Sequence, residues 1–126
     1  MSALGPAQLM AFAGATDLDR AREFYGGVLG LELEQEDSFA CQFRCGDTLL
    51  RVTRVDEVAP APYTVLGWRV PDIESAIQEL AGRGVQFQRY DGMRQDELGA
   101  WSAPGGARVA WFRDPDGNTL SIVELA

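Results

Sequence analysis

The chain repeats one plan of helix and strand, and this internal repeat limits the folds that it can adopt. Thr16 to Leu33 and Val70 to Phe87 each contain an aspartate, an apolar stripe at helical spacing, glycines and the start of a strand. Aspartate is a preferred N-cap and glycine often ends a helix. In the first segment either Thr16 or Asp17 can cap the helix, and in the second segment Asp72 does so. The sequence therefore predicts two equivalent capped helices, each leading into a strand.

Alternating apolar and polar residues predict strands on both sides of each helix. The segments around Gln8 to Ala15 and Tyr63 to Val70 precede the helices, and strands are expected to begin at Leu31 and at Val85 after them. Phe-Arg, a glycine-containing turn and an alternating strand then close each half, with the second turn at Asp114 to Asn118. The predicted fold class is α+β, with two βαβββ modules whose curled mixed sheet forms a cup backed by helices. The predicted boundaries are one domain over 1–126, module one 7–55, linker 56–62 and module two 63–125.

Charge and residue usage exclude several classes of function. The 126 residues contain 11 basic and 19 acidic side chains, a net charge of −8, which argues against nucleic acid or an anionic membrane as partner. No histidine occurs, so the commonest transition-metal ligand and the usual general base are absent. Cys41 shares strand parity with Phe39 and Phe43, which predicts a buried structural thiol. The N-terminal segment is a poor signal peptide and no apolar run could span a membrane, so a cytoplasmic protein is expected.

Three motifs in this order resemble the vicinal oxygen chelate superfamily, which includes glyoxalases, bleomycin-resistance proteins and ring-cleaving dioxygenases. The motifs lie at Asp17 to Gly30, at Val70 to Ile73 and at Phe112 to Asn118, and together they span nearly the whole domain. The resemblance implies a cup between paired modules, a ligand inside it and a homodimer. In the metal-dependent members, inward residues on the first and last strand of each module bind a divalent cation. Those positions fall on Met10, Arg51, Val65 and Ser121.

These four side chains cannot supply the oxygen and nitrogen ligands that such cations need. We therefore expect no metal and no other cofactor. Strand parity and the glycine-rich segment 90–106 predict an apolar and aromatic pocket with a few polar groups. The predicted ligand-binding residues are Met10, Phe12, Arg51, Val65, Arg69, Trp101, Trp111 and Ser121. No catalytic residue is assigned, because Ser121 lies outside any nucleophile elbow.

Several of these residues keep a second interpretation. Arg51 and Arg69 either bind an anionic group of the ligand or reach solvent and pair with acids such as Glu34 and Glu36. Trp101 and Trp111 either line the pocket or pack in a core or an interface. Segment 90–106 is either a lid, with apolar residues at Met93, Leu98 and Trp101, or an irregular crossover.

The leading functional hypothesis is a metal-free protein that sequesters or carries a small, partly aromatic organic molecule. An alternative is a metal-dependent lyase, isomerase or dioxygenase with a non-standard carboxylate site. The acids closest to the relevant strand ends are Glu32, Glu34, Asp47 and Glu124. A third possibility is an interaction module whose cup is filled by its own side chains. The net charge favours a cationic ligand whereas Arg51 favours an anionic one, so the sequence leaves the charge of the ligand open.

Overall fold

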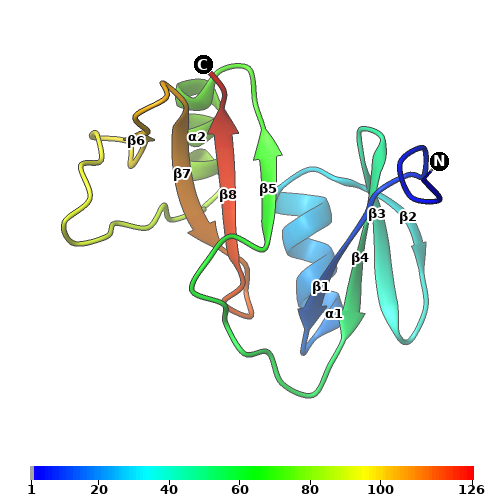
Figure 1. The fold of residues 1–126 in the computed structure, drawn as a ribbon. Helices are drawn as coiled ribbons and strands as arrows, with labels where there is room; N and C mark the ends of the chain where they lie inside the picture. The colour runs from blue at the N-terminus through cyan, green and yellow to red at the C-terminus, as the bar shows by residue number, and fades with distance from the viewer. Residues whose placement is uncertain (1) are drawn as a thin grey trace. The chain divides into compact units, whose positions relative to one another are not determined.

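The computed structural model describes residues 2–126, which divide into two compact units, one ending at Val58 and the other beginning at Ala59. Within these residues each unit contains a four-stranded mixed sheet and one helical segment (Figure 1). The predicted α+β fold class is therefore confirmed. No helix in this part of the chain is long and apolar enough to cross a membrane.

The sheet of the first unit has the strand order β1-β4-β3-β2. Its strands are β1 (Met10–Ala15), β2 (Glu32–Glu36), β3 (Ala40–Cys45) and β4 (Thr48–Arg54). β1 runs parallel to β4, and the other neighbours are antiparallel. Phe12 pairs with Arg51, and Arg51 pairs with Gln42, so these three residues form one row across the sheet. Paired residues in one row point to the same face of the sheet, and so do residues two positions along each strand. The row therefore identifies the residues on the face away from the helix.

The first helical segment starts as predicted, but it does not remain α-helical. Asp17 is the N-cap of α1 (Leu18–Arg22), and its carboxylate accepts a hydrogen bond from the Arg20 N–H at 3.1 Å. The chain then continues as a π-helix, η1 (Glu23–Val28). A β-carbon at Gly26 would lie 3.4 Å from the Phe43 ring, an ordinary van der Waals contact, so the widened turn packs directly on the core. Tyr25 and Phe43 are both fully buried there.

The second unit has the equivalent strand order, β5-β8-β7-β6. Its strands are β5 (Leu66–Arg69), β6 (Trp101–Ser102), β7 (Arg108–Arg113) and β8 (Thr119–Glu124). β5 runs parallel to β8, as β1 does to β4, and the other pairs are antiparallel. Asp72 is the N-cap of α2 (Ile73–Gly82) and accepts a hydrogen bond from the Ser75 N–H at 3.2 Å. The repeat predicted from the sequence is therefore present in the topology of both units.

The strand predicted from Val85 and Phe87 is wrong, because no strand occurs there in the described residues. Val85 is 9% exposed, and the Phe87 ring lies 5.5 Å from the ring of Phe112. Both apolar side chains cover the core, while the backbone of this segment bonds to β7 through the Gln88 N–H, which donates to the Trp111 carbonyl at 2.7 Å. The edge position of this sheet is filled instead by the two residues of β6, which follows α2 after residues 83–100.

Each core lies between one sheet and the helix of the same unit. Leu50, Val52 and Phe43 face the helical segment of the first unit, and Phe112, Leu120 and Ile122 face α2. Cys41 is 1% exposed, which confirms the predicted buried thiol, and burial raises its pKa. Complete burial of one such large apolar side chain contributes about 1.5–3 kcal/mol. The opposite face of each sheet does not contribute to these cores.

Candidate functional site

The predicted ligand-binding residues lie on the sheet faces away from the helices. In the first unit these are Met10, Phe12 and Arg51, and the Met10 and Phe12 side chains are 38% and 61% exposed. Hydrogen bonds from the N–H groups of Phe39 and Ala40 lower the pKa of Asp37, and the charge of Arg51 adds a smaller lowering.

The corresponding row of the second unit contains Gly67, Ser121 and Trp111. Ser121 is 6% exposed, and its hydroxyl oxygen lies 3.2 Å from the place that a β-carbon on Gly67 would occupy. The glycine therefore leaves bare backbone next to the serine. Val65 directly precedes β5, and its backbone N–H donates a hydrogen bond to the Thr119 carbonyl. Arg69, at the end of β5, is exposed and pairs with Val123 of β8.

Three aromatic side chains gather at the end of this row, and we call them the aromatic wall: Tyr90, Trp101 and Trp111. The ring of Trp111 lies 5.7 Å from Tyr90 at 85° and 6.1 Å from Trp101 at 37°. Its indole N–H donates to the Thr64 hydroxyl at 3.2 Å, which fixes the orientation of the ring. Edge-to-face and offset contacts at these separations are favourable. All three rings are only partly buried, so they leave aromatic surface available to a ligand.

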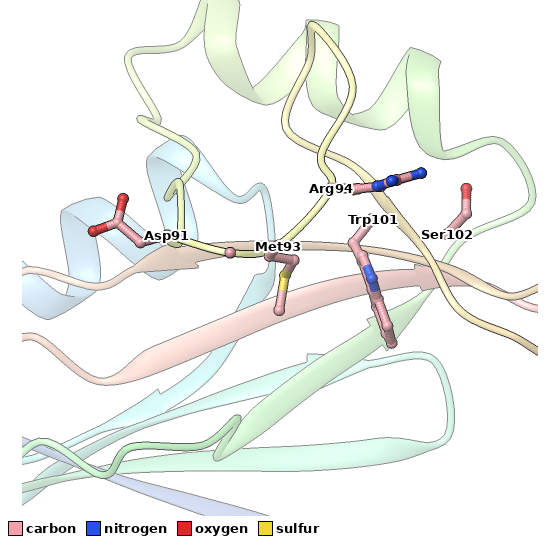
Figure 2. Close-up of a pocket in the computed structure, with 6 residues that line it drawn as sticks. Asp91, Met93, Arg94, Trp101 and Ser102 are labelled. Atoms are coloured by element: carbon pink, nitrogen blue, oxygen red, sulfur yellow. The ribbon is translucent and has the colours of Figure 1, made fainter.

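A pocket of about 540 Å³ opens beside Trp101 (Figure 2). It is lined by Asp91, Gly92, Met93, Arg94, Trp101 and Ser102. In Figure 2 the Asp91 carboxylate points away from Trp101, whereas the Arg94 guanidinium lies on the Trp101 side of Met93. The pocket is widely open to solvent, and its lining combines apolar contacts with a few polar groups, as the lining of sites for small organic molecules does. Trp101 belongs to both the pocket and the aromatic wall.

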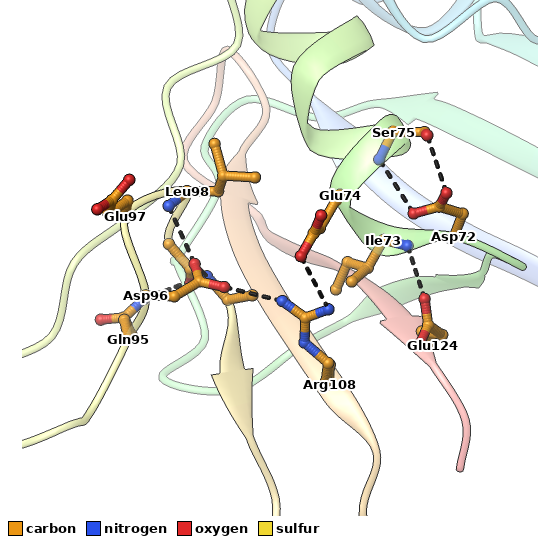
Figure 3. A network of polar contacts seen from close by, with 12 residues as sticks. Asp72, Ile73, Glu74, Ser75, Gln95, Asp96, Glu97, Leu98, Arg108 and Glu124 are labelled. Atoms are coloured by element: carbon orange, nitrogen blue, oxygen red, sulfur yellow. Dashed lines mark hydrogen bonds and ion pairs between the residues drawn. The ribbon is translucent and has the colours of Figure 1, made fainter.

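The loop that carries this pocket is held in place by Asp96 (Figure 3). Its carboxylate accepts hydrogen bonds from the Leu98 N–H at 3.0 Å and the Ala100 N–H at 2.9 Å, and it pairs with Arg108 at 2.8 Å. Arg108 also reaches Glu74 of α2 at 3.5 Å. Burial acts to raise the pKa of Asp96, but the two N–H groups and the guanidinium outweigh it and hold that pKa below its ordinary value. The loop is thereby connected to β7 and, through Arg108, to α2.

The residues at the four implied metal positions do not fit a divalent cation. Met10, Arg51, Val65 and Ser121 offer a thioether, a guanidinium, an isopropyl group and a hydroxyl. Residues 2–126 contain no group of three or more His, Cys, Asp or Glu side chains placed to bind a metal.

Two of the acids in the carboxylate alternative already have structural partners. The Glu34 carboxylate pairs with Arg44, and the Glu124 carboxylate accepts a hydrogen bond from the Ile73 N–H at 2.9 Å (Figure 3). Glu36 pairs with Arg22 at 3.0 Å. In the described residues Glu34 and Glu36 therefore pair with Arg44 and Arg22, whereas Arg69 is exposed to solvent, which is one of the interpretations that the sequence left open.

The structure brings the rings of Trp101 and Trp111 together, and of these two residues Trp101 lines the pocket. Met10, Phe12 and Arg51 lie in the first unit, and Val65, Arg69 and Ser121 lie with the tryptophans in the second. Sequence reasoning missed Tyr90, Asp91, Arg94 and Ser102 as site residues. Their segment was recognised by its length and glycine content, but irregular backbone has no periodicity from which the direction of a side chain can be read.

Comparisons with known proteins agree with this architecture. The model of the Glyoxalase/Bleomycin resistance protein/Dioxygenase superfamily matches residues 8–122. The uncharacterized protein YraH of Bacillus subtilis (strain 168) is 30% identical over 125 residues, covering 86% of this chain and 91% of its own.

Two solved structures share the fold over the full length of both chains. A glyoxalase family protein from Bacillus anthracis has a TM-score of 0.77 at 20% identity. TnmS3, an antibiotic binding protein from Streptomyces sp. CB03234, has a TM-score of 0.73 at 24% identity. Because the family model covers nearly the whole chain and its β-strand plan occurs twice in the structure, the chain belongs to the Glyoxalase/Bleomycin resistance protein/Dioxygenase superfamily.

Proposed function

We propose that the protein is a metal-free binding protein that sequesters or carries a small, partly aromatic organic molecule. The observation that carries this proposal is the position of Trp101, which contributes to the aromatic wall and also lines the 540 Å³ pocket. A planar ligand would stack on the partly exposed indole, and Met93 would supply a second apolar contact.

The polar groups of the pocket would orient such a ligand. Arg94 can donate hydrogen bonds to an acidic group, Asp91 can accept them from a cationic group, and Ser102 can do either. The donor set at the four implied metal positions supports binding without a metal. TnmS3, which shares the fold, is described as an antibiotic binding protein, and a ligand of similar chemical type is part of this proposal.

Isothermal titration calorimetry against aromatic acids, aromatic amines and neutral polycyclic compounds tests the proposal. Trp101→Leu should weaken binding of the best compound roughly tenfold, because a stacking contact contributes about 0.5–1.5 kcal/mol beyond buried area. Trp68→Leu is the matched control, since Trp68 lies on β5 with the parity of buried Leu66. Its affinity should remain that of the wild type. The proposal fails if no compound binds, or if both variants bind as the wild type does.

A further inference from the structure

The side chain of Gln95 connects three backbone groups inside the loop between α2 and β6. Its Oε1 accepts a hydrogen bond from the Tyr90 N–H at 2.8 Å. Its Nε2 donates to the carbonyls of Gln88 at 2.9 Å and Gly99 at 2.8 Å. A primary amide has one acceptor oxygen and two N–H donors. All of these groups are used, so the site is matched to glutamine and not to glutamate, which has no donor when ionised.

These three backbone groups lead directly to the aromatic wall. Tyr90 carries one of the rings that contact Trp111, and Gly99 is two residues before Trp101. Gln95 and Trp101 also form an isolated antiparallel bridge. One side chain therefore sets the distance between the two loop segments that carry Tyr90 and Trp101, while Trp111 is supplied by the rigid strand β7.

Regular strand pairing gives this part of the loop little support. β6 has only two residues, and the described residues 83–100 contain no strand other than the bridge at Gln95. Asp96 closes a neighbouring turn, where its carboxylate accepts hydrogen bonds from Leu98, Ala100 and Arg108. The Gln88 N–H bonds to the Trp111 carbonyl and Trp101 pairs with Val109, and the Gln95 amide links these two segments directly to each other.

We infer that Gln95 is a positioning residue that holds Tyr90 and Trp101 against Trp111 in the arrangement that binds the ligand. The inference rests on the proposed function for its effect on affinity. The arrangement of the rings is a property of the protein without ligand and can be measured separately. Coupled tryptophans a few ångströms apart give a near-ultraviolet circular dichroism signal that depends on their relative orientation.

Gln95→Glu tests the inference, because it keeps size and shape but directs a carboxylate oxygen at two carbonyls. At pH 7 the near-ultraviolet signal of Trp101 and Trp111 should be largely lost, and affinity for the best compound should fall roughly tenfold. Gln86→Glu is the matched control, since Gln86 is exposed in the same connection and its side chain takes no part in the three hydrogen bonds of Gln95. Its spectrum and affinity should remain those of the wild type.

Protonation supplies a rescue of the same variant. Two facing carbonyls favour the neutral carboxyl group, which raises the pKa of a glutamate at this position and lets it donate one hydrogen bond at pH 5. The spectrum and the affinity of Gln95→Glu should therefore move back toward those of the wild type measured at the same pH. Asp96 stays ionised at pH 5 because its pKa is held below its ordinary value, so the neighbouring turn remains in place.

The outcomes separate the two proposals. If no compound binds the wild type, the proposed function fails, yet the spectra of Gln95→Glu and Gln86→Glu still decide the role of Gln95. The inference is overturned if Gln95→Glu matches the control in both measurements, or if it only lowers thermal stability with an unchanged aromatic spectrum. Should Gln95→Glu fail to fold, Gln95→Ala, which leaves the three backbone groups to water, takes its place at pH 7 with the same expected losses.

Discussion

A single carboxylate, that of Asp114, organises the turn between β7 and β8. The side chain is 6% exposed and accepts hydrogen bonds from the N–H groups of Asp116 at 3.0 Å and Asn118 at 2.9 Å. It also accepts one from the Asn118 side-chain amide at 2.8 Å. Gly117 has a φ of 89°, a conformation that glycine adopts without steric cost. The turn was predictable from Asp114-Pro115-Asp116-Gly117-Asn118, because each residue type suits its position.

Asp114→Ala is expected to lower the free energy of unfolding by about 2–4 kcal/mol. The substitution removes the acceptor of two backbone N–H groups and of the Asn118 amide, and the expected loss corresponds to one or two hydrogen bonds to a charged group, at about 1.5–3 kcal/mol each, because water replaces part of the lost bonding. Urea denaturation followed by circular dichroism measures the change. Asp47→Ala in the corresponding turn of the first unit is the control, because that residue is exposed and surface substitutions usually change stability by about 0.5 kcal/mol or less. Equal losses in the two variants would contradict the prediction.

At the scale of elements, hydrophobic periodicity predicted where the two helices lie, but it did not predict that part of the first one is a π-helix. Asp17 and Asp72 cap the two helices as their residue type predicts. The π-helical turn at Glu23–Val28 leaves the apolar stripe intact, with Tyr25 still buried, so no periodic signal marks it. The false strand at Val85 has a different cause, since alternation reports burial and not backbone pairing.

Sequence patterns predicted the residues of the candidate site that lie on regular strands, but not those that lie in the loop. Trp111 and Ser121 follow from strand parity, because β7 and β8 are regular. Tyr90, Arg94 and Gln95 lie in irregular backbone, where side-chain direction is set by specific hydrogen bonds such as those of Gln95 and Asp96. Bonds of this kind join residues close in sequence, yet no spacing rule identifies which polar side chain will turn inward.

The loop between α2 and β6 should lose stability in acid through Asp96. Its pKa is lower in the folded protein than the ordinary value of about 3.9. The stabilisation from its ionised form is therefore fully present above that value and is lost as the pH falls through the lowered pKa. The difference in unfolding free energy between wild type and Asp96→Asn should shrink as the pH falls from about 5 to about 2.

Urea denaturation at a series of pH values measures this difference. Asp91→Asn removes the same charge from the same loop but lies outside the hydrogen bonds around Asp96, and its effect on stability should stay small throughout. A difference for Asp96→Asn that is constant over the whole range would show that the ionised carboxylate does not stabilise the loop.

At the scale of the whole molecule, the repeat predicted two units of equivalent topology, and both strand orders agree with it. The repeat preserves the backbone plan while the side chains differ. Phe12, Arg51 and Gln42 occupy one row, whereas Gly67, Ser121 and Trp111 occupy its counterpart. Self-similarity therefore identified the architecture of this superfamily member, but the chemistry of each unit had to be read from its own residues.

Removal of metal ions should leave the protein unchanged. Dialysis against EDTA is expected to alter neither the melting temperature nor the affinity for an aromatic compound, because the four implied positions carry Met10, Arg51, Val65 and Ser121. Titration with Zn²⁺, Ni²⁺, Mn²⁺ or Fe²⁺, followed by calorimetry, should show no stoichiometric binding. Uptake of one ion per chain with a raised melting temperature would contradict the assignment and favour the metal-dependent alternative.

The three hydrogen bonds of the Gln95 side chain also have a consequence for motion. Because one amide bonds to the Gln88 carbonyl, the Tyr90 N–H and the Gly99 carbonyl, a single rotation of that side chain would break all three hydrogen bonds together. The Tyr90 amide proton, which Gln95 protects directly, should then exchange with solvent in step with its neighbours in the loop and faster than the amide protons of β7 and β8. Strands β7 and β8 would stay folded while the loop between α2 and β6 opens as one cooperative unit.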